Sequence, residues 1–146
     1  MHTFIYGIYP YIALSVLVIG SIARYDRDQF TWKTSSSQLL RRKQLILGSV
    51  LFHIGVLIIF FGHVVGLLTP IPLLDALRIG HGFKQILAIV IGGLGAVSAL
   101  VGGFILLHRR LTDSRIRATS STMDIAILSL LLFQLALGTL SIFVSL

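Results

Sequence analysis

An uncharged run of 24 residues, from Leu45 to Leu68, contains two histidines, His53 and His63. At about 1.5 Å of rise per residue, a helix of this length would cross a bilayer core of roughly 30 Å. Both imidazole rings would then lie in hydrocarbon, where a titratable group carries a desolvation cost. The default interpretation is therefore a functional one, in which a partner satisfies the ring nitrogens. A metal or a haem iron is the strongest such partner.

The spacing of the two histidines restricts what they could bind. Ten residues of helix separate the rings by roughly 15 Å along the axis and by about 80° around it, so one small metal ion cannot bridge them. Two stacked haems could each take one imidazole as an axial ligand, one nearer each membrane face. The other histidines, His2, His81 and His108, lie in flanks or loops. Two interpretations stay open: a two-haem site, or polar rings that form hydrogen bonds between helices.

The apolar runs define the fold class. The chain is 55% hydrophobic, and its four uncharged runs of about 20 residues predict an all-α, polytopic transmembrane helical bundle. The expected spans cover about residues 4–23, 45–68, 86–107 and 125–146, which leaves no room for soluble domains and predicts a single membrane domain, 1–146. The absence of cysteine excludes disulfides, cysteine-ligated clusters and covalent haem attachment, so any haem would be held noncovalently.

The positive charge predicts an orientation. The net charge of +7 would suggest nucleic acid in a soluble protein, but the lysines and arginines lie between the spans. The three connections carry six, two and four of them in chain order, so the positive-inside bias puts the first and third inside and the N-terminus outside. His53 would then lie about one third of the way across from the inner face and His63 nearer the outer face.

Several other residues have a structural interpretation. Gly48, Gly55 and Gly62 repeat every seven residues and favour close helix packing, with haem clearance beside His63 as the alternative. Gln134 in the fourth span is expected to form an interhelical hydrogen bond, and Asp124 suits a helix N-terminus. The third span is expected to present a small-residue face of Gly92, Gly93, Gly95, Ala96, Ala99, Gly102 and Gly103.

The second connection is the candidate for proton chemistry. Asp75, Arg78, His81 and Lys84 lie on the side expected to hold His63. Such groups could bind a quinol hydroxyl or relay its protons. A solvated loop explains them equally simply and is the favoured interpretation on chemistry alone.

Segments along nearly the whole chain resemble one family. They are IYPYIA around Tyr9, GSIARYDRDQFTWKTSSSQ from Gly20, LFHIGVLIIFFGHVVGLLTP from Leu51, HRRL from His108 and RIRATSSTMDIAILSLLLFQLALG from Arg115. They resemble the membrane cytochrome b subunit, called the gamma subunit, of membrane-bound respiratory nitrate reductases. The FHIG and GHxxGxLTP pair is the most specific part of the match.

The resemblance implies a concrete activity. Such subunits bind two b-type haems, take electrons from quinol near the outer face of a bacterial or archaeal cytoplasmic membrane, and pass them to an iron-sulfur subunit and a molybdenum catalytic subunit inside. By this match His53 would ligate the inner haem b and His63 the outer one. Lys84 matches a lysine that the family places at the quinol site, and Gly62 is expected at the same site.

One implied feature is not found in this sequence. Family members have a fifth span that supplies the other histidine to each haem, whereas this sequence ends after the fourth. The possibilities are a fragment, a helix supplied by a second polypeptide, or a loss of ordinary haem binding. We favour an incomplete chain.

Two groups of residues leave the function open to alternatives. Arg41, Arg42, Arg109, Arg110, Arg115 and Arg117 could pair with haem propionates or dock the cytoplasmic subunit, although topology alone explains them. The spans themselves do not reveal the final electron acceptor. A cytochrome b subunit of another quinol-linked reductase, or a structural membrane anchor without haem, are therefore the alternatives. A transporter is disfavoured because no carboxylate lies within a span.

Overall fold

The computed structural model is all-helical in the residues that it describes, which are 2–31, 37, 39–76 and 80–144. Four helices there are long and apolar enough to cross a membrane, over Phe4–Asp28, Arg42–Gly66, Gly82–Thr112 and Thr122–Ile142. This confirms the predicted fold class of a polytopic helical membrane protein. The predicted orientation, with the N-terminus outside, stays a prediction.

The chain contacts divide the molecule into two units, Met1–Ser35 and Ser36–Leu146, which are described separately. The first unit is one apolar helix. A π-helical turn, Phe4–Ile8, leads into α1, Tyr9–Asp28, and a short 3-10 turn, Gln29–Thr31, follows. Pro10 lies in the first turn of α1, where its missing N–H has no helical partner to lose. No residue of α1 is buried.

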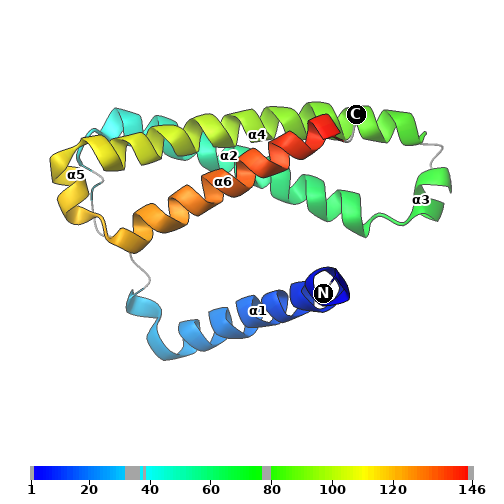
Figure 1. Cartoon of the computed structure of the whole chain (residues 1–146), viewed down its shortest axis with the longest axis horizontal. Helices are drawn as coiled ribbons and strands as arrows, with labels where there is room; N and C mark the ends of the chain where they lie inside the picture. The colour runs from blue at the N-terminus through cyan, green and yellow to red at the C-terminus, as the bar shows by residue number, and fades with distance from the viewer. Residues whose placement is uncertain (1, 32–36, 38, 77–79, 145–146) are drawn as a thin grey trace. The chain divides into compact units, whose positions relative to one another are not determined.

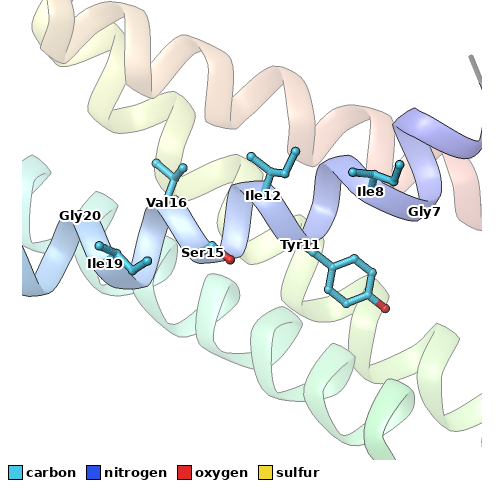
Figure 2. Close-up of a pocket in the computed structure, with 8 residues that line it drawn as sticks. All are labelled: Gly7, Ile8, Tyr11, Ile12, Ser15, Val16, Ile19 and Gly20. Carbon is cyan, nitrogen blue, oxygen red and sulfur yellow. The ribbon is translucent and has the colours of Figure 1, made fainter.

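A shallow apolar groove runs along one face of α1. Figure 2 shows its lining, with Ile8, Ile12 and Val16 projecting from the same side of the helix. Tyr11 and Ser15 bring the only hydroxyl groups among the lining residues, and none of those residues carries a charge. Such a surface suits lipid or another apolar helix and offers no metal ligands.

The second unit is built on two antiparallel helices. They are α2, Arg42–Leu68, and α4, His81–Thr112, joined through the short α3, Ile71–Ala76. A second short helix, α5, Ser114–Thr119, turns the chain into α6, Thr122–Val144. Helix α4 packs against both α2 and α6, whereas among the described residues no Cα atom of α2 lies within 8 Å of one of α6. Figure 1 shows α4 running along α2, with α6 crossing it.

Small residues allow α2 and α4 to approach closely. A methyl group added at Gly55 would lie 2.5 Å from the carbonyl oxygen of Gly95 and 2.8 Å from the Cα of Ala99. Ala99 itself is fully buried. About two turns nearer the start of α2, an added methyl at Gly48 would lie 3.1 Å from the carbonyl oxygen of Gly102. The Ser98 hydroxyl crosses the same interface and donates to the carbonyl oxygen of Leu51 at 3.0 Å.

The two helices separate toward α3. Methyl groups added at Gly62 or Gly66 would have no neighbour within 4 Å, and the same holds for Gly92 on α4. Figure 1 shows α2 leaving α4 over this end. The seven-residue glycine repeat therefore serves close packing at Gly48 and Gly55 only.

Gln134 does not have the expected partner. Its side chain is exposed on α6, and within the described residues it forms no hydrogen bond to another helix. The interhelical hydrogen bond of Gln134 therefore stays a prediction, and α6 packs on α4 through other residues, such as Leu132 against Gly103.

Candidate functional site

His53 and His63 both lie on α2 with exposed side chains. Gly48 and Gly55 face α4, and His53 lies on the opposite side of the helix, so its imidazole points away from α4. His63 lies about 80° around the axis from His53, in the part of α2 that has separated from α4. The contacts of α2 with α4 lie on the other side of the helix, and the His53 side chain is exposed in the described part of the chain.

Each imidazole has one nitrogen held by the backbone of its own helix. His53 Nδ1 lies 2.7 Å from the carbonyl oxygen of Ser49, and His63 Nδ1 lies 2.8 Å from that of Ile59. A carbonyl oxygen only accepts, so each Nδ1 carries the proton and donates it. The neutral ring then keeps the lone pair on Nε2, which is the tautomer that binds a metal.

The surroundings of the two rings differ in two respects among the described residues. The Ser49 hydroxyl oxygen lies 3.2 Å from His53 Nδ1, so this nitrogen has a second polar neighbour. At His63 the corresponding residue, four positions earlier, is Ile59. Phe52 also packs edge-on against the His53 ring, with 5.8 Å between ring centroids.

The ring geometry fits haem iron better than a multidentate metal site. Among the described residues, no group of three or more histidines, aspartates or glutamates comes together in a way that could hold a metal ion. Each of the two imidazoles is instead isolated on an apolar helix, with Nδ1 satisfied and Nε2 free. One such ligand per metal is what an axial position on haem requires.

Lys84 lies in the first turn of α4, and its side chain is half-buried. Continuing the antiparallel register of α2 and α4 beyond Gly55 puts Lys84 roughly one helical turn past His63, toward α3. Gly62, the other residue expected at this site, lies in open space next to His63. Arg78 and the side chains of Asp75 and His81 lie outside the described residues.

The end of the second unit that lies away from α3 is rich in arginine, and one arginine there is a buried structural residue. Arg109, at the end of α4, is 2% exposed and donates to the carbonyl oxygens of Ser37 and Leu40 at 2.6 and 2.5 Å. It also reaches the Ser37 hydroxyl at 3.3 Å. These bonds hold the segment before α2 against the end of α4. Arg109 is therefore unavailable to an external anion. This differs from the sequence-based interpretation, which grouped Arg109 with five other arginines as candidates for pairing with haem propionates or docking a partner subunit.

Asp113 connects three elements at the same end. Its Oδ1 accepts from the N–H groups of Arg115 and Ile116 and so caps α5, while Oδ2 forms an ion pair with Arg41 at 2.8 Å. The N–H group of Ile116, followed by that of Arg115 and by the charge of Arg41, holds the pKa of Asp113 below its usual value. Arg41, at the N-cap of α2, adopts a left-handed conformation, φ 43°, which is uncommon outside glycine.

A capping box begins α6. The Ser121 hydroxyl accepts from the N–H of Asp124 at 3.1 Å, and the Asp124 carboxylate accepts from the N–H of Ser121 at 2.9 Å. Asp124 also lies 3.5 Å from Arg110. This confirms the expected place of Asp124 at a helix N-terminus. Of the six arginines, Arg41, Arg42, Arg115 and Arg117 are exposed, and Arg41 is paired with Asp113.

Comparison with known proteins decides the family. A family model described as nitrate reductase gamma subunit matches residues 2–146. The chain belongs to the nitrate reductase gamma subunit family. It is 50% identical to the respiratory nitrate reductase 1 gamma chain of Escherichia coli (strain K12), over 97% of this chain and 63% of that relative. It is 43% identical to the nitrate reductase gamma chain of Bacillus subtilis (strain 168), again over 97% of this chain and 63% of the relative.

The match confirms the family resemblance and the membrane setting of this gamma subunit homologue. A further relative, the respiratory nitrate reductase 2 gamma chain of Escherichia coli (strain K12), is 50% identical over 94% of this chain and 61% of its own length. The chain thus spans less than two thirds of the length of these relatives. Sequence reasoning missed the Ser49 hydroxyl, although its four-residue spacing from His53 is visible in the sequence.

Proposed function

We propose that this gamma subunit homologue carries one axial imidazole for each of two b-type haems in a quinol-oxidising membrane subunit. His53 is the ligand of the haem nearer the cytoplasm and His63 that of the haem nearer the outer face. Electrons from quinol pass to an iron-sulfur subunit and a molybdenum catalytic subunit of a respiratory nitrate reductase in a bacterial or archaeal cytoplasmic membrane. The family and the names of the relatives support this assignment.

The observation that carries the proposal is the pair of Nδ1–H bonds to the carbonyl oxygens of Ser49 and Ile59. These bonds fix the tautomer and the orientation of each ring, and they leave Nε2 as a free donor of electron density. Haem held at such positions supplies one-electron transfer. The backbone bonds raise the basicity of the imidazoles, and so strengthen their bonds to iron.

In this proposal, a further helix outside the described residues would complete the site that holds each haem. His53 points away from α4, and its side chain is exposed in the part of the chain that is described. The face of α2 that carries His53 is therefore open to another helix. A helix docked there could supply a further histidine and would shield the site from lipid.

Quinol oxidation is assigned to the end of α2 near α3. Lys84 lies one turn beyond His63 in the register of the two helices, where its ammonium group can donate to a quinol oxygen. The open space at Gly62 and the separation of α2 from α4 leave room for a ring beside His63. With the N-terminus outside, as the charges of the connections favour, the quinol protons leave to the outer side.

The cytoplasmic partners are assigned to the opposite, basic end. Arg42, Arg115 and Arg117 are exposed there, whereas Arg109 is buried within the chain. Exposed cations of this kind favour docking to an acidic surface through charge complementarity. The Arg109 and Asp113 contacts would hold this docking surface in shape.

The test is an optical spectrum of membranes that contain the complete complex, recorded as dithionite-reduced minus oxidised. The parent protein should show two b-type haems. His53→Ala and His63→Ala should each remove one of them, because an axial ligand is lost. His108→Ala is the matched control, since His108 is also an exposed histidine on a long helix and should leave both haems in place.

The alternatives predict different spectra. A parent complex without reducible haem would refute the proposal and support a structural anchor. Loss of both haems in the His108→Ala control would show that the loss in the other variants reflects misfolding. A complex that contains both haems but transfers electrons from quinol to an acceptor other than nitrate would point to another quinol-linked reductase.

A further inference from the structure

The two imidazoles on α2 have the same backbone bond but different second neighbours. His53 Nδ1 has the Ser49 carbonyl oxygen at 2.7 Å and the Ser49 hydroxyl oxygen at 3.2 Å. His63 Nδ1 has only the Ile59 carbonyl oxygen at 2.8 Å among the described residues. The difference arises because residue i−4 is serine at one site and isoleucine at the other. It is the clearest asymmetry between two otherwise matched sites.

The roles of the atoms around His53 Nδ1 follow from the shorter contact. If Nδ1 carried a lone pair, that lone pair would face the lone pairs of the Ser49 carbonyl oxygen at 2.7 Å and be repelled. Nδ1 is therefore protonated and donates. Since it has one hydrogen, the Ser49 hydroxyl oxygen can join only as a second acceptor of a shared, three-centre bond.

We propose that the Ser49 hydroxyl is a positioning residue that tunes the haem held by His53 and makes it harder to reduce than it would otherwise be. The inference rests on the proposed haem ligation. A second acceptor at Nδ1–H draws that proton away from the ring and increases the electron density at Nε2. A stronger Nε2 donor stabilises ferric iron relative to ferrous iron, which lowers the reduction potential of that haem. The haem on His63 lacks this contribution.

The experiment is a redox titration of both haems, followed by absorption, in membranes that contain the complete complex. Ser49→Ala should raise the midpoint potential of the His53 haem and leave the His63 haem unchanged. At a fixed ambient potential near the midpoint, the ferrous-to-ferric ratio of the His53 haem should rise roughly threefold to tenfold. The same substitution in a His63→Ala background assigns the shifted signal, because only the His53 haem remains there.

The chain offers a reciprocal control. Ile59→Ser creates at His63 the arrangement that exists at His53, so it should lower the midpoint potential of the His63 haem alone. Ser49→Thr keeps the hydroxyl and should retain the parent potential. A purely structural role of Ser49 would not produce shifts of opposite sign at two different haems.

Each outcome has a distinct meaning. Two haems with unchanged potentials in Ser49→Ala would overturn the inference and leave the proposed function standing. Equal shifts of both haems would also overturn it, because a general loosening of the bundle would then be the cause. A parent complex without haem would overturn the proposed function and, with it, the inference.

Discussion

Gly102→Ala tests the close approach of α2 and α4. The added methyl would lie 2.7 Å from the carbonyl oxygen of Gly48, 2.9 Å from the carbonyl carbon of Leu51 and closer still to the amide nitrogen of Phe52. All three neighbours are backbone atoms, so no side chain can rotate away. Restoring ordinary contact with the closest of these atoms would require the helices to separate by roughly 1 Å, and overpacking of this kind costs about 1–3 kcal/mol.

The separation has a second consequence that adds to the cost. The Ser98 hydroxyl donates to Leu51 at 3.0 Å across the same interface, and a shift of that size would break the bond. Hydrogen bonds between membrane helices contribute about 0.6 kcal/mol each. The expected loss is thus about 2–4 kcal/mol in the free energy of unfolding.

The assay is equilibrium unfolding of the complex in mixed micelles, with increasing mole fraction of a denaturing detergent. Gly92→Ala is the matched control, because it is the same substitution on the same helix and its methyl would have no neighbour within 4 Å. It should be neutral or slightly stabilising, since alanine favours a helix over glycine. Equal unfolding free energies for the two variants would refute the close-packing argument.

Three further predictions concern the basic end of the second unit. Arg109→Met should cost about 2–4 kcal/mol in the same unfolding assay, because it strands two carbonyl oxygens, whereas Arg117→Met, at an exposed site, should change stability by less than about 0.5 kcal/mol. Because the pKa of Asp113 is lowered in the fold, the ionised carboxylate stabilises the fold fully above about pH 4, and this contribution is lost as the pH falls through the lowered pKa. Asp113→Asn should therefore weaken the dependence of the unfolding free energy on pH below about pH 4. Ser121→Ala should cost about 1 kcal/mol by removing the cap of α6, and an unchanged unfolding midpoint would contradict the capping box.

The sequence predicted the four long helices because apolar length is a direct requirement of a bilayer. The sequence predicted the first and last residues of these helices less accurately. The third span was expected from about residue 86 to 107, whereas α4 runs from His81 to Thr112. Apolarity marks the part of a helix that faces lipid, but the helix continues through Arg109 until Asp113 caps the next one. Hydropathy carries no information about that capping bond.

The candidate site, like the helix ends, could be predicted only in part from the sequence. Two histidines in an apolar run are visible in the sequence, and so is their separation. The free Nε2 of each ring follows from side-chain geometry, which the sequence does not fix. Arg109 was grouped with the loop cations because burial of an arginine depends on the carbonyl groups that meet it in space, here those of Ser37 and Leu40.

The glycine pattern on α2 carries a further consequence for the two histidines. Gly48 and Gly55 lie on either side of His53 in the sequence and hold that half of α2 against α4, and the Ser98 bond to Leu51 fixes the same turn. Gly62 and Gly66 lie on either side of His63, where α4 has moved away. The half of α2 that carries His53 is thus held by packing within this chain, and its ring by the bond to Ser49. The direction of the His63 ring depends on its bond to Ile59 and on whatever fills the space between the separated helices, so a ligand at that end has more freedom to reshape its own site.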